Sequence, residues 1–125
     1  MKAYTDIEQS KKLVEILPLE SADMIYVHTI DIGGDWHYDI DFRNNQPLFE
    51  DDICVWSLAA LLDILHSKVK DIPSLSGGGY KDGKYFSDWC LDYEFENGDY
   101  QKTFADNPID ACYEMIIKLN ELKIL

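Results

Sequence analysis

The chain has 125 residues, of which 46% are hydrophobic and 13% aromatic, and its 24 acidic and 11 basic side chains give a formal net charge of −13. A chain of this length and composition buries enough apolar surface to fold, so we expect a single domain over residues 1–125 rather than a disordered chain. The acidic excess disfavours nucleic acid and anionic membranes as partners, because both are bound through clustered Lys and Arg. The expected partner is therefore a protein.

The three cysteines, Cys54, Cys90 and Cys112, lie far apart and form no CxxC pair, so no zinc ribbon or redox dithiol is predicted. An odd number of cysteines without a signal peptide is typical of reduced thiols in the cytoplasm. The opening segment MKAYTDIEQSKK lacks an apolar targeting stretch, and no segment approaches the length of a membrane span. We therefore expect a cytoplasmic protein without membrane association.

A first helix is predicted near the start of the chain. Thr5 and Glu8 form the T-x-x-E pattern of a capping box, in which each side chain accepts a hydrogen bond from the other residue's backbone N–H. Pro18 disfavours helical geometry at the preceding residue, so the helix should end near Leu17. Its buried stripe is expected to consist of Ile7, Ser10, Leu13, Val14 and Leu17.

A β-hairpin is predicted next, with strands over residues 24–32 and 35–43 and a tight turn at Gly33-Gly34. A two-residue turn at these glycines gives the pairs Ile25–Phe42, Val27–Ile40 and Thr29–Tyr38. This register gathers the apolar side chains on an inner face. The outer face is then expected to carry Tyr26, His28, Ile30, His37, Asp39 and Asp41.

A middle helix is predicted in the segment CVWSLAALLDILHSK, with Ser57 as its N-cap. Its apolar residues recur at the helical spacing i, i+3, i+4 and i+7: Leu58, Leu61, Leu62 and Leu65. The segment 44–52 is expected to be a polar loop. The segment 71–84, which contains Pro73 and three successive glycines, is expected to be the clearest loop in the chain.

A second hairpin is predicted around Asn97-Gly98, the strongest short hairpin signal in the sequence. Centring the turn there gives the pairs Phe95–Tyr100, Tyr93–Lys102 and Leu91–Phe104. A final helix should begin at Asn107, with Pro108 at its first position and Asp110 in its first turn. Its buried stripe is expected to comprise Cys112, Met115, Ile116, Leu119 and Leu122.

These elements predict an α+β fold with the order α-β-β-α-β-β-α. The two hairpins should form one four-stranded, mostly antiparallel sheet, with the helices packed mainly on one of its faces. That covered face should carry Ile40 and Phe42 from the first hairpin and Leu91 and Phe104 from the second. The other sheet face would then be available for self-pairing or docking.

The glycine-rich segment 76–84 leads into a near match to the phosphate-binding pattern GxxxxGK[ST]. The chemistry of that loop needs a hydroxyl after the lysine to hold Mg²⁺, and a following helix whose amides meet phosphate. Tyr85 follows the lysine here, and a strand rather than a helix is expected next. We interpret the match as false and expect no nucleotide cofactor.

Two further groups of titratable residues contain side chains that could bind a metal or transfer protons. His28, His37, Asp39 and Asp41 share the predicted outer face and are sensible ligands for a transition metal, but the two imidazoles are only diagonal neighbours. Asp92 and Glu94 alternate onto an exposed strand face, which indicates a charged surface that resists aggregation. No nucleophile has a recognisable base, so no catalytic, metal-binding or cofactor-binding residue is predicted.

Three segments of the chain carry a resemblance: YTDIEQSKKLVEILPLESADM, WSLAALLDIL and DNPIDACYEMIIKLNELKIL. They resemble an uncharacterised family of small acidic proteins from gut anaerobes and their prophages and other mobile elements. The resemblance covers both ends of the chain and the middle helix. It implies an accessory protein of a mobile element, and it implies no activity, cofactor or site residue.

Three classes of function remain. The leading hypothesis is a non-enzymatic protein-interaction module, a possible homodimer, which binds through Tyr26, His28, Ile30 and His37 on the outer face of the first hairpin. The alternative is an acidic inhibitor or immunity-like protein that covers the basic surface of a partner such as a nuclease; its support is the net charge. A further alternative is a small metal-dependent hydrolase.

Overall fold

The structure is a computed structural model that describes residues 2–43, 49, 51–67, 74–94 and 100–124. In these ranges it is an α+β fold with three α-helices and two three-stranded antiparallel sheets, ordered β2-β1-β3 and β4-β5-β6. The elements are α1 (Ile7–Val14), the 3₁₀-helix η1 (Leu19–Ser21), β1 (Met24–Ile30), β2 (Trp36–Phe42), β3 (Ile53–Val55), α2 (Leu58–Ser67), β4 (Ser74–Lys81), β5 (Lys84–Glu94), β6 (Tyr100–Ala105) and α3 (Pro108–Glu121).

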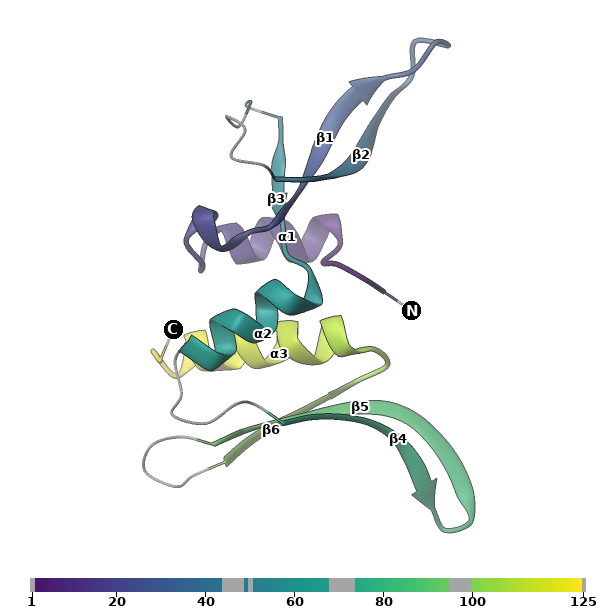
Figure 1. Cartoon of the computed structure of the whole chain (residues 1–125), viewed down its shortest axis with the longest axis vertical. Helices are drawn as coiled ribbons and strands as arrows, with labels where there is room; N and C mark the ends of the chain where they lie inside the picture. Colours follow the sequence, from purple (N-terminus) through teal and green to yellow (C-terminus); the bar gives the residue numbers. More distant parts are fainter. Residues whose placement is uncertain (1, 44–48, 50, 68–73, 95–99, 125) are drawn as a thin grey trace.

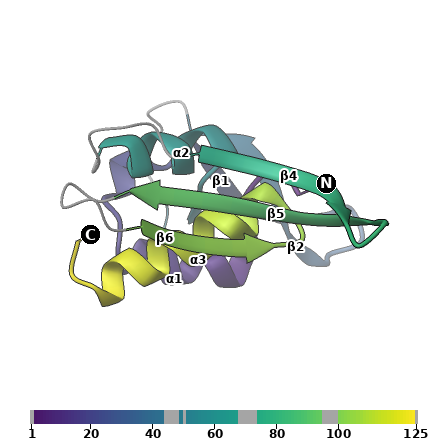
Figure 2. The same cartoon turned by 90° about the horizontal axis from the view of Figure 1, so that it is seen from below.

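The two sheets lie at opposite ends of an elongated molecule, with the helices between them (Figure 1). The three strands of the second sheet run side by side, with α3 behind them in the view from below (Figure 2). The expected single four-stranded sheet is therefore wrong. Each hairpin acquires a third strand that the sequence analysis did not predict: β3 pairs with β1, and β4 pairs with β5.

The first helix begins one residue later than expected. Its capping box is formed by Asp6 and Gln9: the Gln9 N–H donates to the Asp6 carboxylate at 2.8 Å, and the Asp6 N–H donates to the Gln9 side chain at 3.2 Å. Thr5 is instead fully buried, and its hydroxyl is 2.8 Å from that of Ser10. The helix ends at Val14, and Leu17 remains buried beyond it.

The caps predicted for the other two helices are confirmed. The Ser57 hydroxyl accepts a hydrogen bond from the Ala60 N–H at 3.2 Å at the start of α2. The Asn107 side chain accepts one from the Asp110 N–H at 2.9 Å, and Pro108 is the first residue of α3. These contacts satisfy amides that the helix itself leaves without partners.

The core lies between the three helices, β3 and β5. Trp56, directly after β3, is its largest fully buried side chain, and its indole N–H donates to the Ser21 hydroxyl at 3.0 Å. Of the predicted helical stripes, Ile7, Leu58 and Leu62 are only partly buried, and Val14 and Leu122 are exposed. The members of the main cluster are Leu13, Leu17, Ala22, Cys54, Trp56, Leu61, Leu65, Leu91, Ile109, Ala111, Cys112, Met115, Ile116 and Leu119.

The register of the first hairpin differs by one residue from the prediction. The Asp31 carbonyl accepts from the Gly34 N–H at 3.1 Å, the Asp31 N–H donates to the Asp35 carbonyl at 3.0 Å, and Gly34 has a φ of +85°. The loop thus has three residues, 32–34, rather than two. Because side chains alternate, this shift exchanges the faces of β2 relative to β1: Tyr26 now pairs with Ile40 and His28 with Tyr38.

The glycine-rich segment is a strand, which corrects the expected loop over 71–84 from residue 74 onward; residues 71–73 lie outside the described part of the chain. β4 turns into β5 through Asp82 and Gly83, which have φ values of +54° and +77°. Positive φ at both turn residues defines the type I′ turn that suits a tight hairpin. The P-loop look-alike is therefore a hairpin connection in this structure.

The register of β5 with β6 also differs by one residue from the prediction. Leu91 pairs with Thr103 and Cys90 with Phe104, whereas the Asn97-Gly98 turn itself lies outside the described residues. Leu91 is fully buried toward the helices, but Phe104 is 64% exposed on the opposite face. Phe42, expected on the covered face of the first hairpin, is likewise exposed at 66%.

Candidate functional site

The hairpin of β1 and β2 projects away from the helices, with its tip at the end of the molecule (Figure 1). Ile25 is the one buried residue between Met24 and Phe42, and every residue from 30 to 39 is exposed. β3 pairs with β1 only as far as Tyr26, so the outer half of the hairpin extends beyond the three-stranded part of the sheet. Most side chains of the hairpin therefore take no part in the hydrophobic core and remain on the surface.

Ring side chains cover one face of this hairpin, and together with Ile30 we call them the aromatic face: Tyr4, Tyr26, His28, Ile30, Trp36 and Tyr38. The His28 ring is stacked on that of Tyr38, with centroids 4.8 Å apart, and lies 4.7 Å from that of Trp36. Tyr26 contacts Tyr38 edge to face at 6.2 Å and Tyr4 at 6.1 Å. These separations are typical of favourable aromatic pairs.

The base of the aromatic face is fixed to the body of the protein. The Tyr26 hydroxyl donates to the Thr5 carbonyl at 3.1 Å, and burial raises the pKa of this phenol, with further contributions from Tyr4 and Asp6. Beside it lies a pocket of about 330 Å³ lined by Lys2, Ala3, Tyr4, Asp6 and Tyr26. Tyr26 thus links the projecting strands to the segment that precedes α1.

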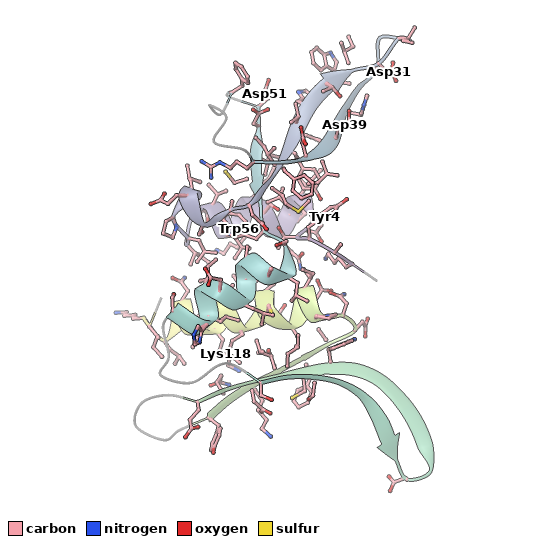
Figure 3. All side chains as sticks on the ribbon, viewed as in Figure 1. Tyr4, Asp31, Asp39, Asp51, Trp56 and Lys118 are labelled. Carbon is pink, nitrogen blue, oxygen red and sulfur yellow. The ribbon has the colours of Figure 1, made fainter. Side chains whose placement is uncertain are left out.

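The outer part of the aromatic face is open to solvent. Trp36 is 62% exposed and Ile30 54% exposed, although they are directly opposite each other at the end of the strands. His28 is partly covered, and its Nδ1 lies 3.8 Å from the Asp51 carboxylate. Figure 3 shows Asp51 on the segment beside the hairpin and Asp31 at its tip.

The predicted interaction surface is brought together only in part. Tyr26, His28 and Ile30 share the aromatic face, as alternate residues of one strand must, but His37 lies on the opposite face of the hairpin. There its Nε2 contacts the Thr29 hydroxyl at 3.1 Å and the Asp39 carboxylate at 3.2 Å. The one-residue register shift causes this separation. It places Trp36 and Tyr38, rather than His37, on the face that carries Tyr26, His28 and Ile30.

The same separation removes the basis for a metal site with both histidines. His28 and His37 now point to opposite faces of the hairpin, so His28 does not share a ligand set with His37, Asp39 and Asp41. In the part of the chain that the structure describes, no group of three or more His, Cys, Asp and Glu side chains is placed to hold a metal ion. A metal-dependent hydrolase therefore gains no support from the geometry.

Thr29, His37 and Asp39 combine a hydroxyl, an imidazole and a carboxylate, the groups of a nucleophilic triad. In such a triad the carboxylate holds one ring nitrogen while the other nitrogen activates the hydroxyl. Here both contacts involve Nε2, and the hydroxyl also donates to Asp39 at 2.9 Å. His37 and Asp39 are exposed and Thr29 is only partly buried, so the cluster lacks the relay and the dry environment that catalysis needs.

The three cysteines are not arranged as nucleophiles. Burial raises the pKa of the Cys112 thiol to about 12, and it also raises the pKa values of Cys54 and Cys90. Near neutral pH these residues are therefore thiols, whereas the thiolate is the reactive form. Cys54 and Cys112 lie in the core cluster, where each packs as a small apolar side chain.

Tyr4, Trp36 and Tyr38 are the members of the aromatic face that sequence reasoning missed. Trp36 and Tyr38 alternate cleanly with polar residues along β2, but the two-residue turn assigned them to the buried face. Tyr4 reaches the hairpin because its backbone forms an isolated antiparallel bridge with Ser57, a contact between distant segments that no local pattern indicates.

Comparisons with protein families, with curated proteins and with solved structures give no match to this chain. Among the described residues, no helix is long and apolar enough to cross a membrane.

Proposed function

We propose that this chain is a non-enzymatic protein-interaction module whose partner docks on the aromatic face. The observation that carries the proposal is the exposure of Trp36 and Ile30 at the outer end of a stack of rings on a projecting hairpin. Aromatic side chains are enriched at the centres of protein interfaces, where large apolar groups next to polar atoms contribute most of the binding energy.

The requirements of the fold do not account for this surface. Cross-strand ring contacts stabilise a hairpin, but they are made through part of each ring and leave the outer surface of Trp36 in water. The core cluster is formed by the helices, β3 and β5, and it contains no member of the aromatic face. Exposed apolar surface of this kind on a water-soluble fold is typical of a binding site.

The hairpin is also held ready for binding. Tyr26 is tied to the Thr5 carbonyl and packed between Tyr4 and Tyr38, so the inner end of the aromatic face has a fixed orientation. A preorganised surface loses less conformational freedom when a partner docks, and so binds more tightly for the same contacts. The resemblance to proteins of prophages and other mobile elements supports an accessory role of this kind in the cytoplasm of the host cell.

The experiment is affinity capture from host cells with tagged wild-type protein and two matched variants. Trp36→Asp places a charge on the aromatic face, where Trp36 is 62% exposed, whereas Phe104→Asp places one on the outer face of the second sheet, at a position of similar exposure, 64%. The proposal expects a protein captured by the wild type and by Phe104→Asp, and at least about tenfold less of it with Trp36→Asp.

Thermal unfolding of both variants serves as the control. Both substituted side chains are mainly in solvent, so the melting temperatures should stay within a few degrees of the wild type. If a folded Trp36→Asp variant captures the same proteins as the wild type, the aromatic face is not the binding surface. If Phe104→Asp alone loses the partner, the second sheet carries the function instead.

A further inference from the structure

We infer that the partner contributes an extended segment that joins the free edge of β2 as a further antiparallel strand and alternates apolar with basic side chains. The apolar side chains extend the aromatic face, and the basic ones lie on the opposite face of the hairpin. This inference rests on the proposed function and adds the conformation and the chemistry of the partner.

The edge of the first sheet that β2 forms is open in the described part of the chain, where the strand order is β2-β1-β3. In an antiparallel pair, only every second residue bonds to the neighbouring strand. Two hydrogen bonds bracket the hairpin, from the Asp31 N–H to the Asp35 carbonyl and from the Arg43 N–H to the Asp23 carbonyl, both at 3.0 Å, and they involve odd-numbered residues. The odd-numbered residues of β2 therefore bond to β1, and the even-numbered ones direct their backbone groups to the free edge.

The free edge offers a short row of backbone donors and acceptors, supplied by Trp36, Tyr38 and Ile40. The row ends at Phe42, because its N–H donates to the Asp41 carboxylate at 2.8 Å. A strand that pairs here bonds to these groups. In recognition of this kind, backbone hydrogen bonds give affinity and alternate side chains give specificity.

The other outer strands are less suited to pairing with a partner. Proteins protect sheet edges with short strands, with lysine or proline, and with bulges. β3 has three residues, the register of β4 is irregular between Gly77 and Gly79, and β6 carries Lys102. β2 has seven residues in an unbroken register with β1, contains no lysine or proline, and projects from the body of the molecule (Figure 1).

The two faces of β2 favour different side chains in the added strand. The even-numbered residues Trp36 and Tyr38 lie on the aromatic face, so apolar residues paired with them extend that face. Asp39 and Asp41 lie on the opposite face, and both are exposed. Lys or Arg across from these carboxylates forms cross-strand pairs of opposite charge. The added strand therefore alternates apolar and basic residues.

A second copy of this chain fits the edge less well. If two β2 strands paired antiparallel, their even-numbered residues would bond across the new edge, and Asp39 and Asp41 of both copies would meet on one face. Like charges in opposing positions of a sheet are destabilising. The aspartates therefore disfavour pairing of β2 with itself and favour a basic strand.

The test selects short peptides displayed on phage on the immobilised full-length protein. Every second position of the peptides is apolar, and the positions between them are random. The expected result is an excess of Lys and Arg over Asp and Glu at the random positions, and no binding of the selected peptides to Trp36→Asp. A synthetic peptide with the same residues in an order that breaks the alternation is the control for the net charge of −13, which attracts any cationic peptide.

N-methylation of the selected peptide tests the strand pairing without any change to the protein. In an antiparallel pair with β2, the amides of the apolar residues point to β2 and those of the basic residues point away. Methyl groups on the apolar residues should weaken binding at least about tenfold, because the hydrogen bonds to β2 are lost. Methyl groups on the basic residues should have little effect.

Two double variants with equal changes in net charge test the charged face. Asp39→Asn with Asp41→Asn removes two charges from β2, and Glu114→Gln with Glu121→Gln removes two from exposed positions of α3. At low salt the β2 variant should bind the peptide about tenfold more weakly than the α3 variant. The difference should shrink as salt is raised, because ions screen exposed charge pairs.

Each other outcome overturns the inference in a distinguishable way. Peptides that need Trp36 but respond equally to both patterns of N-methylation contradict an added strand and leave the proposed function standing. A loss confined to methylation of the basic residues contradicts the antiparallel direction. Peptides without a basic excess, or with equal affinity for the two double variants, contradict the basic partner. Binding that is independent of Trp36, or a selection that yields no binder, contradicts both the inference and its link to the aromatic face, and the capture experiment then decides the proposed function separately.

Discussion

The indole ring of Trp89 lies against the backbone of Gly77 on the neighbouring strand, so that a Cβ atom added to Gly77 would meet the ring at 2.4 Å. The two residues are paired across β4 and β5, next to an irregularity in their register. Glycine has no side chain to shield the strand backbone from water, and an aromatic ring from the neighbouring strand shields it instead. This contact explains why a glycine-rich segment forms a strand here.

We expect Gly77→Ala to lower the free energy of unfolding by about 1–3 kcal/mol, because the added methyl group displaces a ring that packs against the core. Chemical denaturation measures this change. Ser76→Ala, at the preceding exposed position of β4, is the matched control and should have little effect. Equal stability of the two variants would mean that the ring does not lie over Gly77.

The N-terminal segment is tied to α3 by a charged contact that predicts a pH dependence. Lys2 Nζ lies 2.8 Å from the Asp110 carboxylate and 2.9 Å from that of Asp6. Burial alone would raise the pKa of Asp110, but hydrogen bonds from Lys2, Gln9 and Asn107 outweigh it and hold the pKa below its ordinary value of 3.8. This contribution to stability is therefore complete above the ordinary value and is lost as the pH falls through the lower, folded-state pKa.

Asp110→Asn should accordingly reduce the free energy of unfolding by about 1 kcal/mol at pH 7, and the difference from the wild type should shrink below the ordinary pKa. Urea denaturation at neutral pH and at several values below 3.8 measures the difference. Asp63→Asn, at an exposed position of α2, is the control and should follow the wild type throughout. A deficit in Asp110→Asn that stays constant to the lowest pH would contradict this account.

The sequence predicted the helices well because their signals are local. Asn107 and Ser57 are the caps that were expected, and the apolar spacing of α3 identified Cys112, Met115, Ile116 and Leu119 among its buried side chains. At the start of α1 the local signal is ambiguous, because both Thr5 and Asp6 have side chains that suit a cap. Tertiary contacts decide between them. The N-terminal segment pairs with Trp56 and Ser57, directly after β3, and there Thr5 is buried against Ser10, which leaves the cap to Asp6.

The sequence predicted that both hairpins exist, but it did not predict which side chains lie on which face of each hairpin. For the first hairpin, Gly33-Gly34 fits either a two-residue or a three-residue loop, and only the hydrogen bonds of Asp31 select the longer one. One residue of difference exchanges the faces of a strand. This is why the sequence found half of the aromatic face, Tyr26, His28 and Ile30, and assigned His37 to it in place of Trp36.

The strands β3 and β4 were missed because their partners, not their own patterns, make them strands. β3 has three residues and runs directly into the helical pattern of α2, so no alternation is visible. β4 contains three glycines and depends on Trp89 and on the Asp82-Gly83 turn. Without these two strands, the hairpins were expected to pair with each other in one sheet.

The account's central claim is that the partner contacts the aromatic face of the first hairpin, and hydrogen–deuterium exchange with the captured partner tests it most directly. Docking there should slow amide exchange over β1 and β2, residues 24–42, because contact shields the outer strands from solvent. The exposed face of the second sheet, in β5 and β6, should exchange at the same rate with and without the partner. Protection confined to β5 and β6, with no change over residues 24–42, would contradict the claim.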